Sequence, residues 1–273
     1  GLGGAFAPLV AWMVLSLGWR KSSFITGVFV IVFMASTSWI VKQSPESMNL
    51  KPDGAQDGTD RGATIKNSEF TDGFTVKEAM HTLAYWQLVF SDGLGNTVHA
   101  GLSFLMAPVM IWFLQGAGRE LTESLIIASI FMMMMSIGSM VFNPIIGWVG
   151  DRWRKEKVSA ICMALGAGSI FVLLDKSGAL WQLGVFSIML SLAEAANPLG
   201  WAILGDYFGR EHYAALRGWQ NLPQHLMSMS TPVWMGFIFD TSGSYYWALV
   251  PCMGIYCAAA VSYWTLRKPS ISQ

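Results

Sequence analysis

Titratable and amide side chains recur at helical spacing inside stretches of sequence that are otherwise apolar. In the segment SDGLGNTVHAG, Asp92, Asn96 and His99 are separated by four and then three positions, which places their side chains on one face of a helix. A carboxyl, an amide and an imidazole on one face can bind a polar solute, and an imidazole exchanges protons near neutral pH. This face is therefore a candidate lining for a cavity that binds a solute or a proton.

Two further segments mix polar and apolar residues in the same way. In RGWQNLPQHL, Asn221 and His225 are four positions apart, with Gln224 beside them. In SLAEAANPLG, Glu194 and Asn197 lie one helical turn apart and a proline follows; a proline inside a helix leaves a backbone carbonyl without its usual donor. We predict that these two segments and the one that carries Asp92 line a common cavity.

Hydrogen bonding between helices is the competing explanation for these polar residues. Such bonds contribute well under ~2 kcal/mol each between membrane helices, and they would account for the asparagines and histidines without any function. Glu194 is harder to explain in this way, because an ionisable group at membrane depth is costly and usually faces a cavity or a partner. We weigh substrate binding or proton coupling by Glu194 equally with a structural role. Asp92 stands near an expected span end, where water could simply hydrate it.

The composition shows which elements must position these residues. Of the 273 residues, 53% are hydrophobic and 12% are charged, against roughly 45–50% and about 25% in soluble domains. Apolar stretches long enough to cross a bilayer alternate with short charged joints, and they lack the alternation of barrel strands. The sequence predicts an all-α polytopic membrane protein with about eight spans, at 2–17, 22–41, 84–114, 121–149, 157–175, 180–204, 217–239 and 246–266.

Composition and spacing also argue against several classes of function. The net charge is zero, so no nucleic-acid partner is indicated. Cys162, Cys252 and Cys257 fall inside expected spans, and we expect them to pack rather than to form a disulfide or hold a metal. An intramembrane aspartyl protease would need Asp151 and Asp206 in one site, yet both lie among cations at span ends. We expect no enzymatic activity, no metal and no cofactor.

Basic residues sort to one side of the expected membrane. If successive joints alternate between the two sides, one side receives only Arg20, Lys21, Arg119 and Lys176, and the rest of the 17 Lys and Arg fall on the other. The positive-inside rule then places the basic side in the cytoplasm, together with the long loop after the second span and the C-terminus. We expect a multi-pass protein of the cell membrane in this orientation.

One long polar stretch interrupts the apolar pattern. Residues 43–83 are rich in Pro, Gly, Asp and Ser, a composition typical of a flexible linker. Near its end, Thr75 and Glu78 have the spacing of a capping box, which predicts a short helix ahead of the third span. The linker divides the chain into 1–42, with two spans, and 84–273, with the others.

A dense group of charges follows the fourth span, in the joint GWVGDRWRKEK. This joint contains Gly147, Gly150, Asp151, Arg152, Arg154 and Lys155. A place at a cytoplasmic turn explains the cations, but not the order in which two glycines precede an acid beside fixed cations. This order resembles the signature loop of the major facilitator superfamily of transporters, in the copy between helices 8 and 9. The family pattern has Gly after the first Arg, where this chain has Trp153.

Further joints resemble the same family in the same order. The sequence GDYFGR at 205–210 looks like the loop after helix 10, Pro232 and Gly236 look like helix 11, and GWR at 18–20 looks like the joint between helices 5 and 6. The stretch PESMNLKPDG at 45–54 is similar to the central loop of the monocarboxylate and oxalate:formate branch. The resemblance covers the whole chain, matched to helices 5 to 12.

This resemblance implies a domain plan. Residues 1–42 would be the last two helices of an N-terminal bundle, residues 43–83 the central cytoplasmic linker, and residues 84–273 the six-helix C-terminal bundle. The chain begins GLGGAF without an initiator Met, and we expect helices 1 to 4 of its own protein to be missing as partners.

The resemblance also implies a secondary transporter that works by alternating access. A small organic anion such as a monocarboxylate is the expected solute, with the proton as the candidate coupling ion. The cavity residues would be Asp92, Asn96, His99, Glu194, Asn197, Asn221, Gln224 and His225. No Lys or Arg falls deep in the third to eighth expected spans, so no cation for the anion is evident there. A membrane receptor or scaffold that kept the fold without transport is the alternative.

The family also suggests a role for the signature loop. Its acid is thought to hold a neighbouring helix end and a basic residue, which stabilises one conformation of the carrier. Carried over, Asp151 is expected to contact the start of the seventh span near Arg217, where a helix N-terminus favours an acid. The alternative is that Asp151 only balances Arg152 in solvent, an interaction of about 0–1 kcal/mol.

Overall fold

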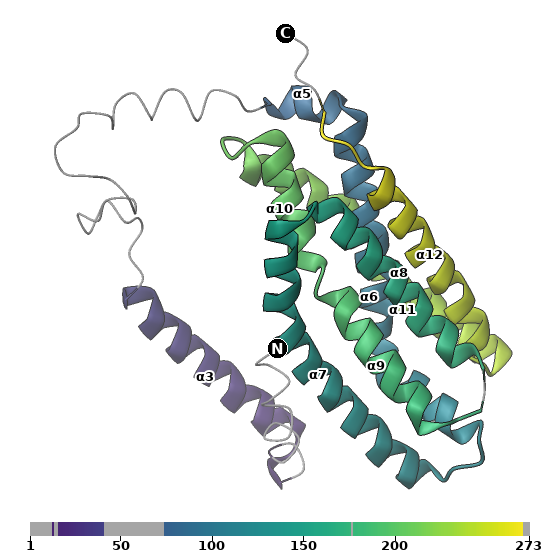
Figure 1. Cartoon of the computed structure of the whole chain (residues 1–273). Coiled ribbons are helices and arrows are strands. Elements are labelled where there is room, and N and C mark those ends of the chain that lie inside the picture. The colour runs from purple at the N-terminus through teal and green to yellow at the C-terminus, as the bar shows by residue number, and fades with distance from the viewer. Residues whose placement is uncertain (1–12, 14–15, 41–73, 176, 270–273) are drawn as a thin grey trace. The chain divides into compact units, whose positions relative to one another are not determined.

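The computed structural model describes residues 13, 16–40, 74–175 and 177–269 (Figure 1). Its helices are α3 (Trp19–Ile40), α5 (Val76–His81), α6 (Leu83–Gln115), α7 (Leu121–Arg152), α8 (Lys155–Leu174), α9 (Leu180–Glu194), α10 (Asn197–Phe208), α11 (Tyr213–Ser242) and α12 (Tyr246–Thr265). The described residues contain no strand, and the predicted all-α fold is confirmed. Of the first expected span only residues 13, 16 and 17 are described, and residues 43–73 of the expected linker lie outside the described part.

The chain divides into two compact units, and each is described by itself. One contributes α3, a 22-residue helix of mostly exposed apolar side chains such as Phe24, Phe29 and Ile31. The other contains α5 to α12.

Six segments of the described residues are long and apolar enough to cross a membrane. They are α3, α6, α7, α8, the segment Leu180–Phe208 and α12. The seventh expected span, 217–239, lies within the 30-residue α11, which is more polar than the others but packs along α6. Each expected span from the second to the eighth therefore corresponds to one helix or, for 180–204, to the pair α9 and α10.

Helix α6 packs against both α11 and α12, while α8 packs against α12 and α9 (Figure 1). Glycines let these helices approach closely, as is common between membrane helices. A Cβ at Gly101 of α6 would lie 2.4 Å from Cγ2 of Thr231 on α11, and one at Gly166 of α8 would lie 3.0 Å from the Tyr256 ring on α12. In contrast, α7 has few buried side chains and packs mainly on α9.

The short helix α5 begins with the predicted capping box. The Thr75 hydroxyl accepts from the Glu78 backbone N–H at 3.3 Å, and a Glu78 carboxylate oxygen accepts from the Thr75 backbone N–H at 2.8 Å. The Thr75 N–H and hydroxyl that stabilise the carboxylate lower the pKa of Glu78 below its usual value. The capping-box prediction is confirmed.

Most basic residues of the described bundle gather at one end, which we call the basic end. It is formed where α7, α10 and α12 finish and where α6, α8 and α11 begin (Figure 1). Its cations are Lys77, Arg152, Arg154, Lys155, Lys157, Arg210, Arg217, Arg267 and Lys268. At the opposite end, the described residues include Arg119.

Candidate functional site

Asp92 is the centre of a buried polar cluster in the bundle. Its side chain is only 3% exposed. Its Oδ2 accepts from Nη1 of Arg217 and from Nε2 of Gln220, both at 3.1 Å. Its Oδ1 accepts from the hydroxyl of Tyr263 and from Nδ2 of Asn96, both at 3.4 Å. This carboxylate therefore connects α6, which carries it, with α11 and α12.

Helix α10 closes the cluster with one glycine and one tryptophan. A Cβ at Gly200 would lie 2.7 Å from Oδ1 of Asp92 and 3.2 Å from the hydroxyl of Tyr263, so only glycine allows this approach. The Arg217 guanidinium lies 4.8 Å from the centre of the Trp201 ring, a distance at which a cation is attracted by the ring face. Four helices thus meet at one ion pair.

Two expectations about this region are wrong. Asp92 is not hydrated at a span end, because the donors of α11 and α12 enclose it. A cation does face the interior of the bundle, since the Arg217 side chain is 15% exposed and is directed inward by its bond to Asp92. This cation could not be recognised from the sequence, because Arg217 lies near the start of α11 and reaches Asp92 only through its long side chain.

A second titratable pair joins α6 to α9. Nδ1 of His99 lies 3.0 Å from Oε1 of Glu194, and the two side chains are 36% and 16% exposed. The predicted polar face of α6 therefore divides into two parts: Asp92 and Asn96 belong to the buried cluster, and His99 belongs to a more accessible pair.

The His99–Glu194 pair lies halfway along its helices and at a break in one of them. His99 is the midpoint of the 33-residue α6, and Glu194 is the midpoint of the 29-residue segment Leu180–Phe208. The helix breaks directly after Glu194, between α9 and α10. Pro198 would be the donor to the Glu194 carbonyl in an unbroken helix, but proline has no N–H. The helix break and the proline thus lie beside the titratable pair.

The buried face of α11 is shifted by one position along the sequence from the predicted face. Gln220 and Gln224 are buried, and the side-chain oxygen of each has no hydrogen-bond partner among the described residues. Asn221 is half-buried and His225 is exposed. Gln224 is thus the predicted α11 residue that faces the interior, whereas His225 does not join the other site residues.

Several members of the site were missed from sequence, and Asn197 remains apart from it. Asn197 is half-buried at the first position of α10. Gln220 could have been found, because Arg217, Gln220 and Gln224 follow the helical spacing of three and four residues. Tyr263 and Gly200 have no such local signal, because single residues of other helices reach Asp92 only through the tertiary packing.

The signature loop lies at the basic end, around the junction of α7 and α8. Gly150 packs closely, since a Cβ there would lie 2.5 Å from a Leu199 methyl group, whereas a Cβ at Gly147 would meet nothing within 4 Å. Arg152 lies 3.8 Å from the centre of the Trp148 ring. Lys155 bonds to Asp206 at 2.5 Å, which connects α8 to α10.

The expected contact between Asp151 and Arg217 does not form. Asp151 is exposed, and the described ion pair of Arg217 is with Asp92. A buried carboxylate with no other cation attracts a guanidinium more strongly than an acid already solvated by water. Arg217 thus belongs to the buried cluster and not to the signature loop.

Comparison with known proteins places this architecture in a family. The family model of the Major Facilitator Superfamily matches residues 93–273. The probable galactarate/D-glucarate transporter of Escherichia coli (strain K12) is 21% identical over 265 residues, which cover 94% of this chain and 59% of that protein. Its namesake in Bacillus subtilis (strain 168) is 22% identical over 97% of this chain and 60% of that protein. A gallate transporter of Pseudomonas putida is 24% identical over 80% of this chain and 50% of that protein.

The chain spans about three fifths of the two first relatives. The narrower likeness to the monocarboxylate and oxalate:formate branch stays a prediction. The match to the family covers most of the helical bundle. It includes His99, Glu194 and Arg217, and it begins one residue after Asp92. The chain is a multi-pass membrane protein and belongs to the Major Facilitator Superfamily.

Proposed function

We propose that this chain is part of a secondary transporter that moves a small organic anion across the cell membrane by alternating access. The three similar proteins are named for galactarate, D-glucarate and gallate, all of which are hydroxylated carboxylates. That shared chemistry favours a hydroxylated carboxylate. Galactarate and D-glucarate carry two carboxylates and gallate carries one, so the expected monocarboxylate would be a solute like gallate. The family membership and the titratable groups inside the bundle support this proposal.

The proposal includes a domain plan and an orientation. Residues 1–42 form the last two helices of one bundle, residues 43–83 the central linker, and residues 84–273 the second bundle. The concentration of cations at the basic end supports a cytoplasmic location for that end, for the linker and for the C-terminus.

The His99–Glu194 pair is the proposed site of solute and proton binding. Carriers of this type bind near the bilayer midplane, commonly at a discontinuous helix. The observation that carries the proposal is the position of both side chains, 3.0 Å apart, at the midpoints of their spans and beside the α9–α10 break. A proton taken up by this pair would free the His99 ring from Glu194, so that the ring could face the solute carboxylate.

The Asp92 cluster has a different part in the proposal. Asp92 already neutralises Arg217 at 3.1 Å, and the pair is less accessible than His99. We propose that this cluster holds α6, α10, α11 and α12 together as one rigid body. A bundle that is rigid in this way can rock without changing its internal packing. The Lys155–Asp206 ion pair in the same way holds α8 and α10 together at the membrane surface.

Uptake by membrane vesicles tests the proposal. Cells expressing the complete reading frame that carries this chain supply vesicles, which receive radiolabelled D-glucarate, galactarate or gallate with an inward proton gradient. We expect accumulation of at least one of these solutes above vector-only vesicles. Binding of a solute without accumulation would instead favour the alternative, a receptor or scaffold with the same fold.

Two histidines of the chain provide a matched pair of variants. We expect His99→Gln to reduce uptake strongly, because the imidazole that faces Glu194 is lost, and His81→Gln to leave it nearly unchanged, because His81 is exposed on α5, outside the predicted cavity. Equal effects of the two substitutions would contradict the placement of the site at His99.

A further inference from the structure

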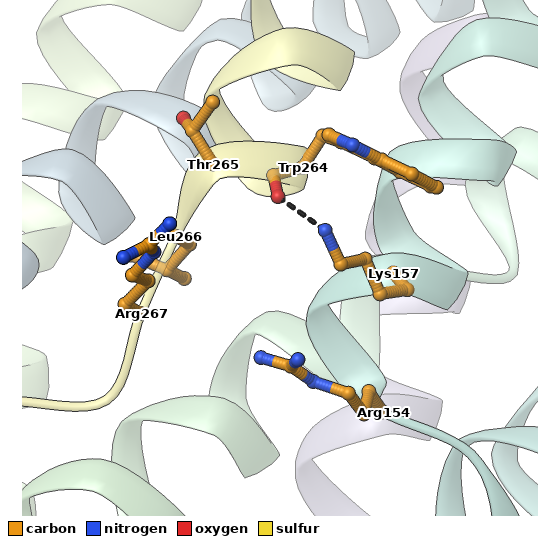
Figure 2. A pocket seen from close by; sticks show the side chains of 6 residues that line it. All are labelled: Arg154, Lys157, Trp264, Thr265, Leu266 and Arg267. Atoms are coloured by element: carbon orange, nitrogen blue, oxygen red, sulfur yellow. Dashed lines mark hydrogen bonds between the residues drawn. The ribbon is translucent and has the colours of Figure 1, made fainter.

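A basic pocket lies at the basic end between α8 and α12, outside both titratable clusters. Its lining residues are Arg154, Lys157, Trp264, Thr265, Leu266 and Arg267 (Figure 2). In Figure 2 Lys157 comes from the first turn of α8 and Arg154 from the N-cap position just before it, while Trp264 comes from α12 and Arg267 from the segment after it. Three of the six lining residues are cations and none is acidic.

Contacts within the pocket leave most of its positive charge available. Nζ of Lys157 donates to the Trp264 carbonyl at 2.5 Å and lies 3.9 Å from the centre of the Trp264 ring, which holds the ammonium at the pocket wall. Arg154 pairs with Glu156 through Nε and Nη2, and its guanidinium carries further N–H donors that a ligand could engage. Arg267 is exposed and has no ion pair among the described residues.

An apolar exposed surface continues from this pocket along the bundle. Ile161 lies one helical turn beyond Lys157 on α8 and is 46% exposed, while Val261 lies one turn before Trp264 on α12 and is 64% exposed. Trp264 itself is 55% exposed, at the level where tryptophan is typical of the membrane interface. A ligand that fits this surface has an anionic group at one end and hydrocarbon at the other.

The size of the pocket limits what it can hold. Its volume is about 280 Å³, slightly less than the roughly 300–1,000 Å³ of sites that enclose a whole small molecule. It can therefore hold the head of a ligand whose remainder lies outside, against Ile161 and Val261. Basic pockets between membrane helices are known to suit lipid head groups.

We propose that this pocket is a binding site for an anionic phospholipid. The phosphate lies between Arg154, Lys157 and Arg267, and the acyl chains follow the surface of Ile161 and Val261. This site is independent of the solute that the protein carries. It would connect the start of α8 to the end of α12 through a bound lipid in addition to the Lys157 hydrogen bond.

Native mass spectrometry of the full chain in detergent tests the proposal, with phosphatidylglycerol as the probe and phosphatidylcholine, which is zwitterionic and has no net charge, as the comparison. We expect the wild-type chain to retain phosphatidylglycerol preferentially. The double variant Lys157→Gln/Arg267→Gln should bind it roughly 30-fold more weakly, since each cation near the surface contributes about 1 kcal/mol. The control variant Lys77→Gln/Arg210→Gln removes two exposed cations of the same end outside the pocket, and it should bind as the wild type does.

The single variant Arg267→Gln guards against a folding artefact, because this exposed side chain has no ion pair to lose. We expect it to weaken phosphatidylglycerol binding roughly fivefold. Equal retention of phosphatidylcholine, or an equal loss in the control variant, would overturn the proposal. Displacement of the lipid by millimolar inorganic phosphate would also overturn it, since the pocket would then be a site for soluble anions.

Discussion

Removing the charge of Asp92 should destabilise the bundle strongly, because Asp92 is buried and paired with Arg217. In Asp92→Asn the side chain keeps its shape, but Arg217 loses its counter-ion. The new amide has one acceptor oxygen where the carboxylate had two, so the donors Gln220, Tyr263 and Asn96 can no longer all be satisfied.

The structure sets the size of this effect. Breaking a buried ion pair by removing one partner typically costs about 3–5 kcal/mol. Arg217 is 15% exposed and keeps its contact with Trp201, so it can still turn partly toward water. We therefore expect a loss near the lower limit, about 3 kcal/mol. Arg217→Gln should cost more, because the Asp92 side chain left behind is only 3% exposed.

Thermal unfolding of the purified full chain in detergent measures these losses, with size-exclusion chromatography used to quantify the folded protein that remains at each temperature. A loss of about 3 kcal/mol corresponds to a midpoint lowered by roughly 6–12 °C. The double variant Asp92→Asn/Arg217→Gln should lose less than the sum of the two single variants, because it leaves no charge unpaired. Arg210→Gln, an exposed cation of the same end, is the control. Midpoints of the single variants that match this control would refute the reasoning, as would strict additivity in the double variant.

Three other predictions concern local contacts. Gly200→Ala should lower the unfolding midpoint, because the new Cβ would lie 2.7 Å from Oδ1 of Asp92, which hydrogen-bond donors hold in place. The control Gly236→Ala meets nothing within 4 Å and should be neutral or stabilising. Equal midpoints for the two variants would mean that the carboxylate can move aside. Thr75→Ala should speed amide hydrogen exchange in α5 about fivefold, as expected for loss of an N-cap, and unchanged exchange would show that the cap is not needed. Because the folded-state pKa of Glu78 is lowered, its contribution is present above the pKa of the unfolded chain. In wild type this protection should therefore decline as the pH falls through the folded-state pKa of Glu78, and protection that grew on acidification would contradict the assignment.

The helices could be predicted from sequence because their signal is local. Stretches of about 20 apolar residues identify α6, α7, α8 and α12, and the Thr75–Glu78 spacing identifies the start of α5. Glu194 and His99 were also candidates from sequence, because titratable residues are conspicuous within an apolar span. Their contact with each other could not be predicted, since it depends on how α6 and α9 are packed.

The Asp92 cluster shows where sequence reasoning fails. Its partners come from α11 and α12, more than 120 residues away along the chain, and nothing in the local sequence of Tyr263 distinguishes it from a packing residue. Arg217 was instead assigned to Asp151, because both lie at the same expected membrane surface. The length of an arginine side chain allows it to leave that surface, and spacing along the sequence does not reveal the direction that it takes.

The most direct test of the central claim is uptake of labelled solute by vesicles that contain Glu194→Gln, compared with wild type across a range of pH. Vesicles come from cells that express the complete reading frame, and the solute is whichever of D-glucarate, galactarate or gallate the wild type accumulates. We predict that the variant still exchanges solute across the membrane but no longer accumulates it when an inward proton gradient is applied. Accumulation with an unchanged pH dependence in Glu194→Gln would contradict the assignment of solute and proton binding to the His99–Glu194 pair.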